Sequence, residues 1–437
     1  MNVTKTFFTS ALLLSLATSL STGYAKNLLE VYHVSKTNDT TLQQAHAVLQ
    51  STQYQHRQSR AALLPQADFS IETSHSEQEI GNDSSSNSDW GYTLSITQSI
   101  YDKSNYDSLS QTDKLLAKSE ADYKAAQQNL IIRVAEAYFD VLAAQDNLNF
   151  SESETEANAR QLEQTKQRFE VGLIAITDVH EAQAAHDLAL ARKIVAQNDL
   201  SSAKEALREL TGQYYDSFQG VGENIPLEKP EPFDADTWAD AALENNLRII
   251  SSQLALASTR AEVKKQQSGH LPKLDLIGRH NYRDDAGDTF GGESITDTSI
   301  TLQLSVPLYQ GGATSARVKT AEAQYTQSLA ELEQTRRNVQ RLTRDAFSNV
   351  VANISQVRAL HQGIISTKSS LEASQAGLEV GTRTTVDVLN TRRELFRAQR
   401  DHARARYDYI LSTLRLKEAS GSLQEEDLQK INKLLTE

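Results

Sequence analysis

Histidine and cysteine are the residues whose spacing would reveal a metal site or a reactive thiol, and neither is placed for that chemistry here. The chain has ten histidines, but no two lie three or four residues apart, the spacing that puts two metal ligands on one face of a helix. His180 and His186 come nearest, six residues apart. Because the chain has no cysteine, disulfides, thiolate ligands and thiol nucleophiles are excluded.

Glycine and serine give no catalytic signature either. Gly220-Val221-Gly222 and Gly311-Gly312 are not followed by the Lys-Ser or Lys-Thr pair of a phosphate-binding loop, and neither belongs to a dinucleotide fingerprint. No Gly-x-Ser-x-Gly motif is present to expose a serine nucleophile. The sequence therefore predicts no enzyme, no metal site and no cofactor.

The elements that would position any site form one unit used twice. Phe169-Glu170-Val171-Gly172 recurs as Leu378-Glu379-Val380-Gly381. Residues 207–212 correspond to 416–421, and residues 64–69 correspond to 271–276. Such a duplication gives each subunit internal pseudo-symmetry.

Composition favours elongated helices and an exported protein. Of 437 residues only six are proline, and aromatic residues make up 6%. The formal net charge is −13 without any basic run, which argues against nucleic acid or anionic lipid as partners. Residues 1–25 resemble a secretory signal peptide, with a membrane anchor as the alternative. No later apolar run approaches the roughly 18 residues of a membrane helix, so the mature chain is either soluble in the periplasm or crosses a membrane as strands.

Two very long helices are predicted. Residues 102–171 contain no glycine or proline and predict a helix on the order of 100 Å long. Apolar or small residues recur at every seventh position: Leu109, Leu116, Tyr123, Leu130, Ala137 and Ala144. Residues 313–376 repeat this pattern with one interruption at Gly363.

Each long helix should be followed by a turn and a second helix. We expect Gly172 and Gly381 to end the long helices, and the second helices to start near Asp178 and Asp387. The second helices have small side chains at heptad spacing: Ala182, Ala189, Ala196, Ala203 and Leu210, then Thr391, Ala398, Ala405, Ser412 and Ala419. Each hairpin should therefore be a tight antiparallel coiled coil.

Alternating apolar and hydroxyl or amide residues predict strands with one apolar face, over roughly the 9–11 residues of a tilted membrane strand. These strands cover residues 67–80, 90–100, 273–285 and 299–308, with Gly81–Asp89 and Ala286–Asp297 as exposed loops. A soluble hairpin with one wet face is the alternative, although the adjoining helices offer no broad apolar stripe to cover it. Four strands cannot close a membrane barrel, so strands in a bilayer would require oligomerisation.

The linker between the two copies covers residues 212–233 and is expected to be irregular because it contains three prolines. Asp234 or Asp236 should cap the helix that follows.

Four segments together resemble the TolC family of outer-membrane channels: residues 168–179, 380–389, 269–276 and 307–312. The resemblance extends from Asn27 to the end of the chain and is weakest in the two loops. It implies a homotrimer of mixed, mainly helical fold. A long α-helical coiled-coil barrel would join a transmembrane β-barrel to which each internally duplicated chain contributes four strands.

The expected division of the chain combines the resemblance with the pattern of elements. It comprises a signal peptide (1–25), N-terminal helices (26–66), a β-hairpin (67–101), a coiled-coil hairpin (102–211), an equatorial linker (212–235), repeat-two helices (236–271), a second β-hairpin (272–309), a second coiled-coil hairpin (310–420) and a C-terminal tail (421–437).

The resemblance also implies a gate at the periplasmic end of the tunnel. Thr177 and Asp178 on the outer hairpin would link to Arg383 on the inner hairpin of a neighbouring subunit; alternatively, Arg383 is a solvated residue at a helix start. An arginine–carboxylate link is directional, yet weak enough in water for a docking partner to break.

Two further sets of residues follow from the same resemblance. Asp387 would form a ring of carboxylates that retains cations, with Asn390 where the family has a second aspartate; helix capping is the alternative role of Asp387. Gly172, Leu173, Gly381 and Thr382 would form the tip that meets a periplasmic adaptor, although helix capping explains the glycines without a partner.

The implied function is that of an exit duct for multidrug efflux and type I protein secretion, in the outer membrane and extending into the periplasm of a Gram-negative bacterium. Expected partners are two further copies of the chain, a periplasmic adaptor, an inner-membrane transporter of the RND, ABC or MFS class, and outer-membrane lipid. The alternative is a periplasmic coiled-coil scaffold without a pore.

Overall fold

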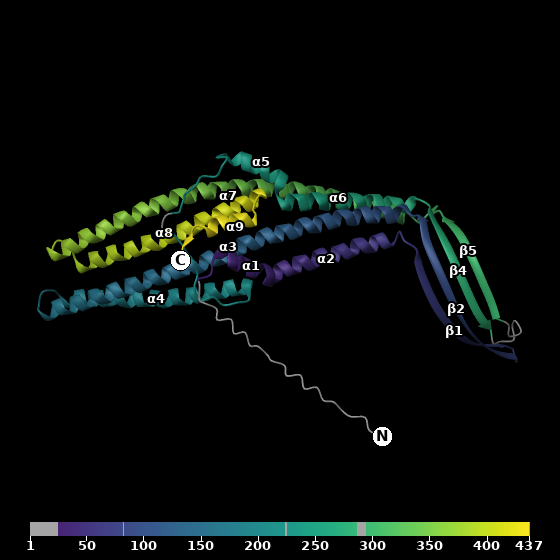
Figure 1. Ribbon diagram of the computed structural model, residues 1–437, viewed down its shortest axis with the longest axis horizontal. Coiled ribbons are helices and arrows are strands. Elements are labelled where there is room, and N and C mark those ends of the chain that lie inside the picture. The colour runs from purple at the N-terminus through teal and green to yellow at the C-terminus, as the bar shows by residue number, and fades with distance from the viewer. Residues whose placement is uncertain (1–24, 82, 223–224, 286–293, 437) are drawn as a thin grey trace, which may run out of the picture.

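The computed structural model describes residues 25–81, 83–222, 225–285 and 294–436. The expected signal peptide lies outside these residues except for Ala25. The molecule is elongated, with its four long strands gathered at one end and the tips of two helical hairpins at the other (Figure 1).

Two long helices run through the helical part of the molecule. Helix α3 spans Lys103–Glu170 and α7 spans Ala313–Glu379, which confirms the predicted pair of long helices. Gly363 lies inside α7, so the expected interruption of the pattern does not break the helix. A single glycine costs about 1 kcal/mol relative to alanine, which a helix packed along its whole length tolerates.

Each long helix forms a hairpin with a shorter one. Helix α4 (Ile176–Thr211) packs on α3, and α8 (Thr385–Ser420) packs on α7. In α4, the predicted stripe of small residues is almost free of solvent at Ala182, Ala189 and Ala196, where exposure is at most 1%. These small side chains let the two helices approach closely.

Two other helices continue the short ones toward the strands. Helix α2 (Thr40–Ala61) begins where α4 ends, and α6 (Leu247–Gln267) begins where α8 ends. The Asn38 amide donates to the Thr211 carbonyl at 2.7 Å, and the Asn246 amide donates to the Ala419 carbonyl at 2.8 Å. These bonds satisfy carbonyl groups that a helix end otherwise leaves unpaired. These helices form one layer, called the helical wall below. Across the layer, α4 and α2 come first, then α3, then α8 and α6, and finally α7.

A belt of smaller elements covers the middle of this wall (Figure 1). It contains α1 (Leu28–Asn38), α5 (Ala235–Asn245) and α9 (Glu425–Asn432), together with the paired strands β3 (Gly220–Val221) and β6 (Leu435–Thr436). The main hydrophobic core lies under the belt and includes Leu28, Leu130, Tyr138, Phe139, Leu414 and Leu428. The linker is therefore less irregular than expected, since Gly220–Val221 pairs with the C-terminal tail.

Polar contacts fix the belt to the wall. The Tyr138 hydroxyl bonds to the carbonyl oxygens of Lys26 and Gln219 at 3.0 and 2.8 Å. The Asp234 carboxylate accepts from the Thr237 backbone N–H at 2.9 Å, which confirms Asp234 as a cap of α5.

The four long strands form one antiparallel sheet in the order β1-β2-β4-β5. They span Gln66–Ile80, Asp83–Tyr101, Lys273–Asp285 and Ser294–Ser305, and the short 3₁₀ helix Ser268–His270 precedes β4. Strands β1 and β5 are the edges of this sheet, as the order shows.

The prediction of an exposed loop at Gly81–Asp89 is wrong. Strand β2 already begins at Asp83, which pairs with Ile80 across a two-residue turn. Gly81 has a φ of +69°, the left-handed conformation that such a tight hairpin turn requires. The ladder is made by backbone groups, so the serine-rich segment continues the strand despite its low strand propensity.

The second β-hairpin differs from the prediction at both ends of β5. Residues 294–297, expected in a loop, belong to the strand, while Val306–Leu308, expected in the strand, follow its end at Ser305. Pro307 has no backbone N–H for the ladder, which accounts for the early end. The remainder of the expected loop, residues 286–293, lies outside the described residues.

Candidate functional site at the hairpin tips

The two glycines at the hairpin tips end the long helices, as predicted. Gly172 and Gly381 have φ angles of +76° and +79°. The Leu173 N–H donates to the Arg168 carbonyl at 2.9 Å, and the Thr382 N–H donates to the Gly377 carbonyl at 2.8 Å. This is the Schellman geometry, in which glycine adopts the left-handed conformation at low cost.

The two tips differ in how the next helix starts. Helix α8 begins with a capping box, in which the Asp387 N–H donates to the Thr384 hydroxyl oxygen at 3.2 Å. Asp387 Oδ2 in turn accepts from the Thr384 N–H and hydroxyl, both at 2.9 Å. Helix α4 starts after Ala175, which has no side chain to cap it. The helix-capping role considered for Asp387 is therefore present, at the third helical position and with Thr384 as the cap.

Hydrogen bonds to the Asp387 carboxyl also favour its ionised form. The backbone N–H and the hydroxyl of Thr384, with a smaller contribution from Arg383, lower the pKa of the Asp387 carboxyl. Among the described residues, both hydrogen bonds that the Asp387 carboxylate accepts end on Oδ2, and Oδ1 accepts none. The carboxylate can cap the helix and still present a charged oxygen.

The three expected latch residues are not joined within one chain. Thr177 and Arg383 are exposed and Asp178 is half-buried, and no hydrogen bond or ion pair links their side chains among the described residues. The Arg383 backbone N–H donates to the Gly377 carbonyl at 3.1 Å. A Cβ on Gly377 would lie 2.6 Å from Arg383 Cγ, so the side chain of Arg383 lies directly against this glycine. Sequence reasoning missed Gly377; its only signal was a second glycine four residues before Gly381.

Asn390 lies away from the tip turn itself. Its side chain is exposed and lines a cavity of about 270 Å³ between α8 and the α3/α4 hairpin. The same cavity is lined by Glu154, which is only 2% exposed. Glu154 Oε1 lies 2.7 Å from Arg192 on α4, and Oε2 lies 3.9 Å from Arg400 on α8. This buried carboxylate connects three helices, and no pattern in the sequence predicts it.

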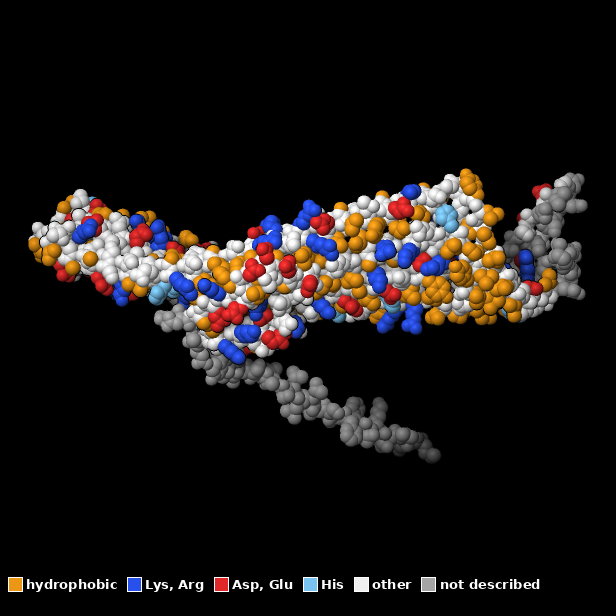
Figure 2. Space-filling model, turned by 90° about the horizontal axis from the view of Figure 1, so that it is seen from above, with side chains coloured by type: hydrophobic (Ala, Val, Ile, Leu, Met, Phe, Trp, Pro, Cys, Tyr) orange, Lys and Arg blue, Asp and Glu red, His pale blue; other side chains and the backbone are white. Residues whose placement is uncertain are grey.

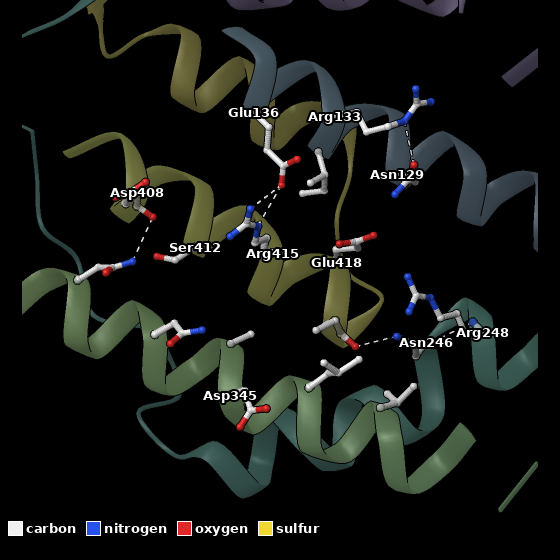
Figure 3. Close-up of a pocket in the computed structure, with 17 residues that line it drawn as sticks. Asn129, Arg133, Glu136, Asn246, Arg248, Asp345, Asp408, Ser412, Arg415 and Glu418 are labelled. Atoms are coloured by element: carbon white, nitrogen blue, oxygen red, sulfur yellow. Dashed lines mark hydrogen bonds and ion pairs between the residues drawn. The ribbon is translucent and has the colours of Figure 1, made fainter. Parts of the chain in front are cut away.

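A second polar cavity of about 570 Å³ lies midway along the wall, between α3, α6, α7 and α8 (Figure 3). Glu136 and Arg415 form an ion pair there at 2.7 Å. Burial raises the pKa of the Glu418 carboxyl, while Arg248 opposes the shift and Glu136 adds to it. Acidic and basic groups are mixed in this cavity, so it does not select one sign of charge. Among the described residues, no three metal-binding side chains come together.

The sheet carries an uncovered apolar surface. Phe69, Leu94, Ile300, Leu302 and Leu304 are between 41% and 82% exposed. Strand register places them on one face, since Phe69 pairs with Leu94, and Ile96 connects to Ile300 through Gly278. Figure 2 shows hydrophobic side chains gathered at this end of the molecule. An apolar patch of this extent marks contact with a membrane or a partner. Among the described residues, no helix combines the length and apolar character needed to cross a membrane.

A duplicated wall of long helices with an apolar sheet at one end defines the class of outer-membrane channel proteins. The family model described as outer membrane efflux protein matches residues 31–213 and 238–422, so the chain belongs to this family. It is 40% identical over 421 residues to the outer membrane protein TolC of Vibrio cholerae serotype O1, covering 96% of each chain. The resemblance to the TolC family is thereby confirmed.

Two further proteins agree with this assignment. The alkaline protease secretion protein AprF of Pseudomonas aeruginosa is 27% identical over 420 residues, covering 93% of this chain and 87% of AprF. A crystal structure of CusC has the same fold, with a TM-score of 0.79 at 18% identity, and covers 91% of this chain and 92% of that one. The protein is an outer-membrane efflux and secretion duct, and its family is one of transport proteins rather than enzymes.

Proposed function

We propose that three copies of the chain close into one channel-tunnel that is gated at the hairpin tips. The observation that carries this proposal is that both the sheet and the helical wall end in open edges. In the part of the chain that the structure describes, strands β1 and β5 each pair on one side only. An unpaired backbone group in lipid costs several kcal/mol, so β1 of one copy should pair with β5 of the next and close a β-barrel.

The helical wall supports the same closure. The wall has two edges, one formed by α2 with α4 and the other by α7. Both expose apolar side chains: Val48, Tyr54, Ile194 and Val195 on the first, and Leu329 and Ile365 on the second. Contact between neighbouring copies would bury both sets. The number three follows from the family resemblance, because the edges alone would accept another cyclic number. The apolar sheet face, which the described helices leave exposed, counts against a periplasmic scaffold without a pore.

The gate we propose consists of weak polar links between neighbouring copies. Thr177 and Asp178 of one copy would bind Arg383 of the next. An exposed arginine–carboxylate pair is directional but contributes at most about 1 kcal/mol, so a few such links hold the tunnel shut and still yield to a docking partner. That partner would be a periplasmic adaptor that meets the exposed tip residues Gly172, Leu173, Gly381 and Thr382, with an RND, ABC or MFS transporter in the inner membrane.

Replacing Arg383 by serine should open the tunnel. Loss of the guanidinium removes every proposed link at once, and single-channel conductance in planar bilayers should rise severalfold. Arg397→Ser is the matched control, because Arg397 is exposed on α8, which begins two residues after Arg383, and among the described residues it pairs only with Glu394, at 3.1 Å. Unchanged conductance in Arg383→Ser, or an equal rise in the control, would contradict the latch.

The second proposed element is a ring of Asp387 carboxylates at the constriction, which retains cations. Asn390 adds no charge to this ring. We expect Asn390→Asp to tighten block by a multivalent cation such as hexamminecobalt by roughly tenfold, equivalent to about 1.4 kcal/mol. Block is measured as the concentration that halves the single-channel current. A strong block that does not change in Asp387→Asn would show that the ring lies elsewhere.

A further inference from the structure

The arginines of α8 differ in whether an acidic group lies near them, and the proposed gate does not depend on this difference. Helix α8 carries seven arginines, and five of them lie within 4.0 Å of a carboxylate: Arg393, Arg397, Arg400, Arg404 and Arg415. Arg406 donates to the Gly222 carbonyl at 2.9 Å, and its charge acts on the carboxyl of Asp146. Arg392 is the exception among them.

Arg392 is a buried guanidinium with no acidic neighbour in the described chain. Its side chain is only 9% exposed. It donates to the Ala157 carbonyl at 3.1 Å and to Gln161 Oε1 at 3.4 Å. A guanidinium has five N–H donors, so these two bonds leave most of them unused. Burial lowers the pKa of Arg392, and the like charge of Arg160 lowers it further. A buried charge in such surroundings is costly unless a counter-ion compensates it.

The surroundings of Arg392 form a cavity of about 340 Å³ between α3, α7 and α8. Its polar lining consists of arginine and glutamine side chains only: Arg160, Gln161, Gln164, Gln375 and Arg392. Arg160 pairs with Glu156 at 2.6 Å, but both side chains are 69% exposed, so this pair is weak and Arg160 can turn toward the cavity. Two cations and several amide donors thus surround a space without a carboxylate in its lining.

We propose that this cavity binds a small divalent oxyanion of the inorganic phosphate type. The guanidiniums of Arg392 and Arg160 bind its oxygens, and the glutamine amides supply further donors. The site joins α3 of the outer hairpin to α7 and α8 of the inner hairpin. A bound anion therefore holds the two hairpins of one chain together and opposes opening of the tunnel; this consequence, unlike the site itself, rests on the proposed function.

The site is tested by calorimetric titration of the detergent-purified full chain with sodium phosphate. Chloride is used to keep the ionic strength constant. Saturable binding is expected, and Arg392→Gln should weaken it at least tenfold. Arg160→Gln should weaken phosphate binding as well. Because Arg160 is exposed, this variant is expected to fold and replaces Arg392→Gln in the test if that variant does not fold. Arg397→Gln, the matched control, should bind like the unmodified chain. Absence of saturable binding up to about 10 mM phosphate, or binding that both variants retain, would overturn the site.

Conductance tests the consequence separately. Phosphate should reduce the current through Arg383→Ser channels, and Arg392→Gln added to that background should abolish the reduction. Binding by calorimetry with no effect on current would overturn the connection between the hairpins and leave both the site and the tip latch standing. A tip latch that fails its own conductance test leaves the calorimetric result unaffected.

Discussion

Replacing Gly421 by alanine should destabilise the protein far more than the same change at Gly212, although the two glycines occupy equivalent positions in the duplicated chain. Each follows the last residue of a short helix, α8 or α4, and their φ angles are +78° and +70°. An alanine in this left-handed conformation costs roughly 1–2 kcal/mol at either position.

The difference lies in what an added Cβ would meet. At Gly421 it would lie 2.3 Å from the Asn245 carbonyl oxygen and 2.9 Å from the Asn246 nitrogen, both backbone atoms at the junction between α5 and α6. At Gly212 the nearest atom is Asn38 Nδ2 at 3.9 Å, an ordinary contact. Backbone at a helix junction cannot move without separating α8 from α6, so we expect a total cost of about 2–5 kcal/mol for Gly421→Ala and about 1–2 kcal/mol for Gly212→Ala.

Thermal unfolding of the two purified variants in the same detergent, followed by circular dichroism, measures this difference. Midpoints are compared rather than free energies, because an oligomer with a separate sheet and helical wall is not expected to unfold in two states. Equal midpoints for the two variants would show that the α8–α6 junction is looser than the distances indicate.

The sequence predicts the regular parts of this fold because they depend on local rules. Long stretches without glycine or proline, glycines after them and heptads of small residues account for α3, α4, α7 and α8 within three residues of their bounds. The duplicated motif even pairs Gly212 with Gly421. The duplication does not predict that Gly421 lies against the junction between α5 and α6 while Gly212 has no comparable close contact, because the contact at Gly421 joins residues far apart in the chain.

The errors have a common physical cause. Ser84–Asp89 form part of β2, although their side chains are poor strand formers, since pairing with β1 supplies the hydrogen bonds. Arg392 and Glu154 lie in polar segments that read as a solvated helix face, yet both are buried because separate hairpins pack over them. The proposed link between Asp178 and Arg383 would cross between copies, so a single chain contains no contact that could support or oppose it.

Replacing Glu154 by glutamine should strongly destabilise the packing of the two hairpins against each other. The substitution keeps the shape of the side chain and removes the charge that Arg192 and Arg400 share, at 2.7 and 3.9 Å. Breaking a buried ion pair leaves unpaired charge behind and costs about 3–5 kcal/mol. Arg192 and Arg400 are 37% and 23% exposed, so water compensates them in part and we expect about 2–4 kcal/mol.

Glu156→Gln is the control for this experiment, because Glu156 lies two residues away on α3 and pairs with Arg160 at 2.6 Å, where both side chains are 69% exposed. Its loss should cost less than about 1 kcal/mol. Limited proteolysis of the hairpins, together with the thermal midpoint, separates the two variants: only Glu154→Gln should make α4 and α8 more accessible to protease. Since Glu154 bonds to α4 and lies near α8, the inner hairpin can move away from the outer one only if Arg400 leaves this carboxylate. Glu154→Gln should therefore also raise the open probability of the channel, and a destabilised variant with unaltered gating would show that the two hairpins move together as one body.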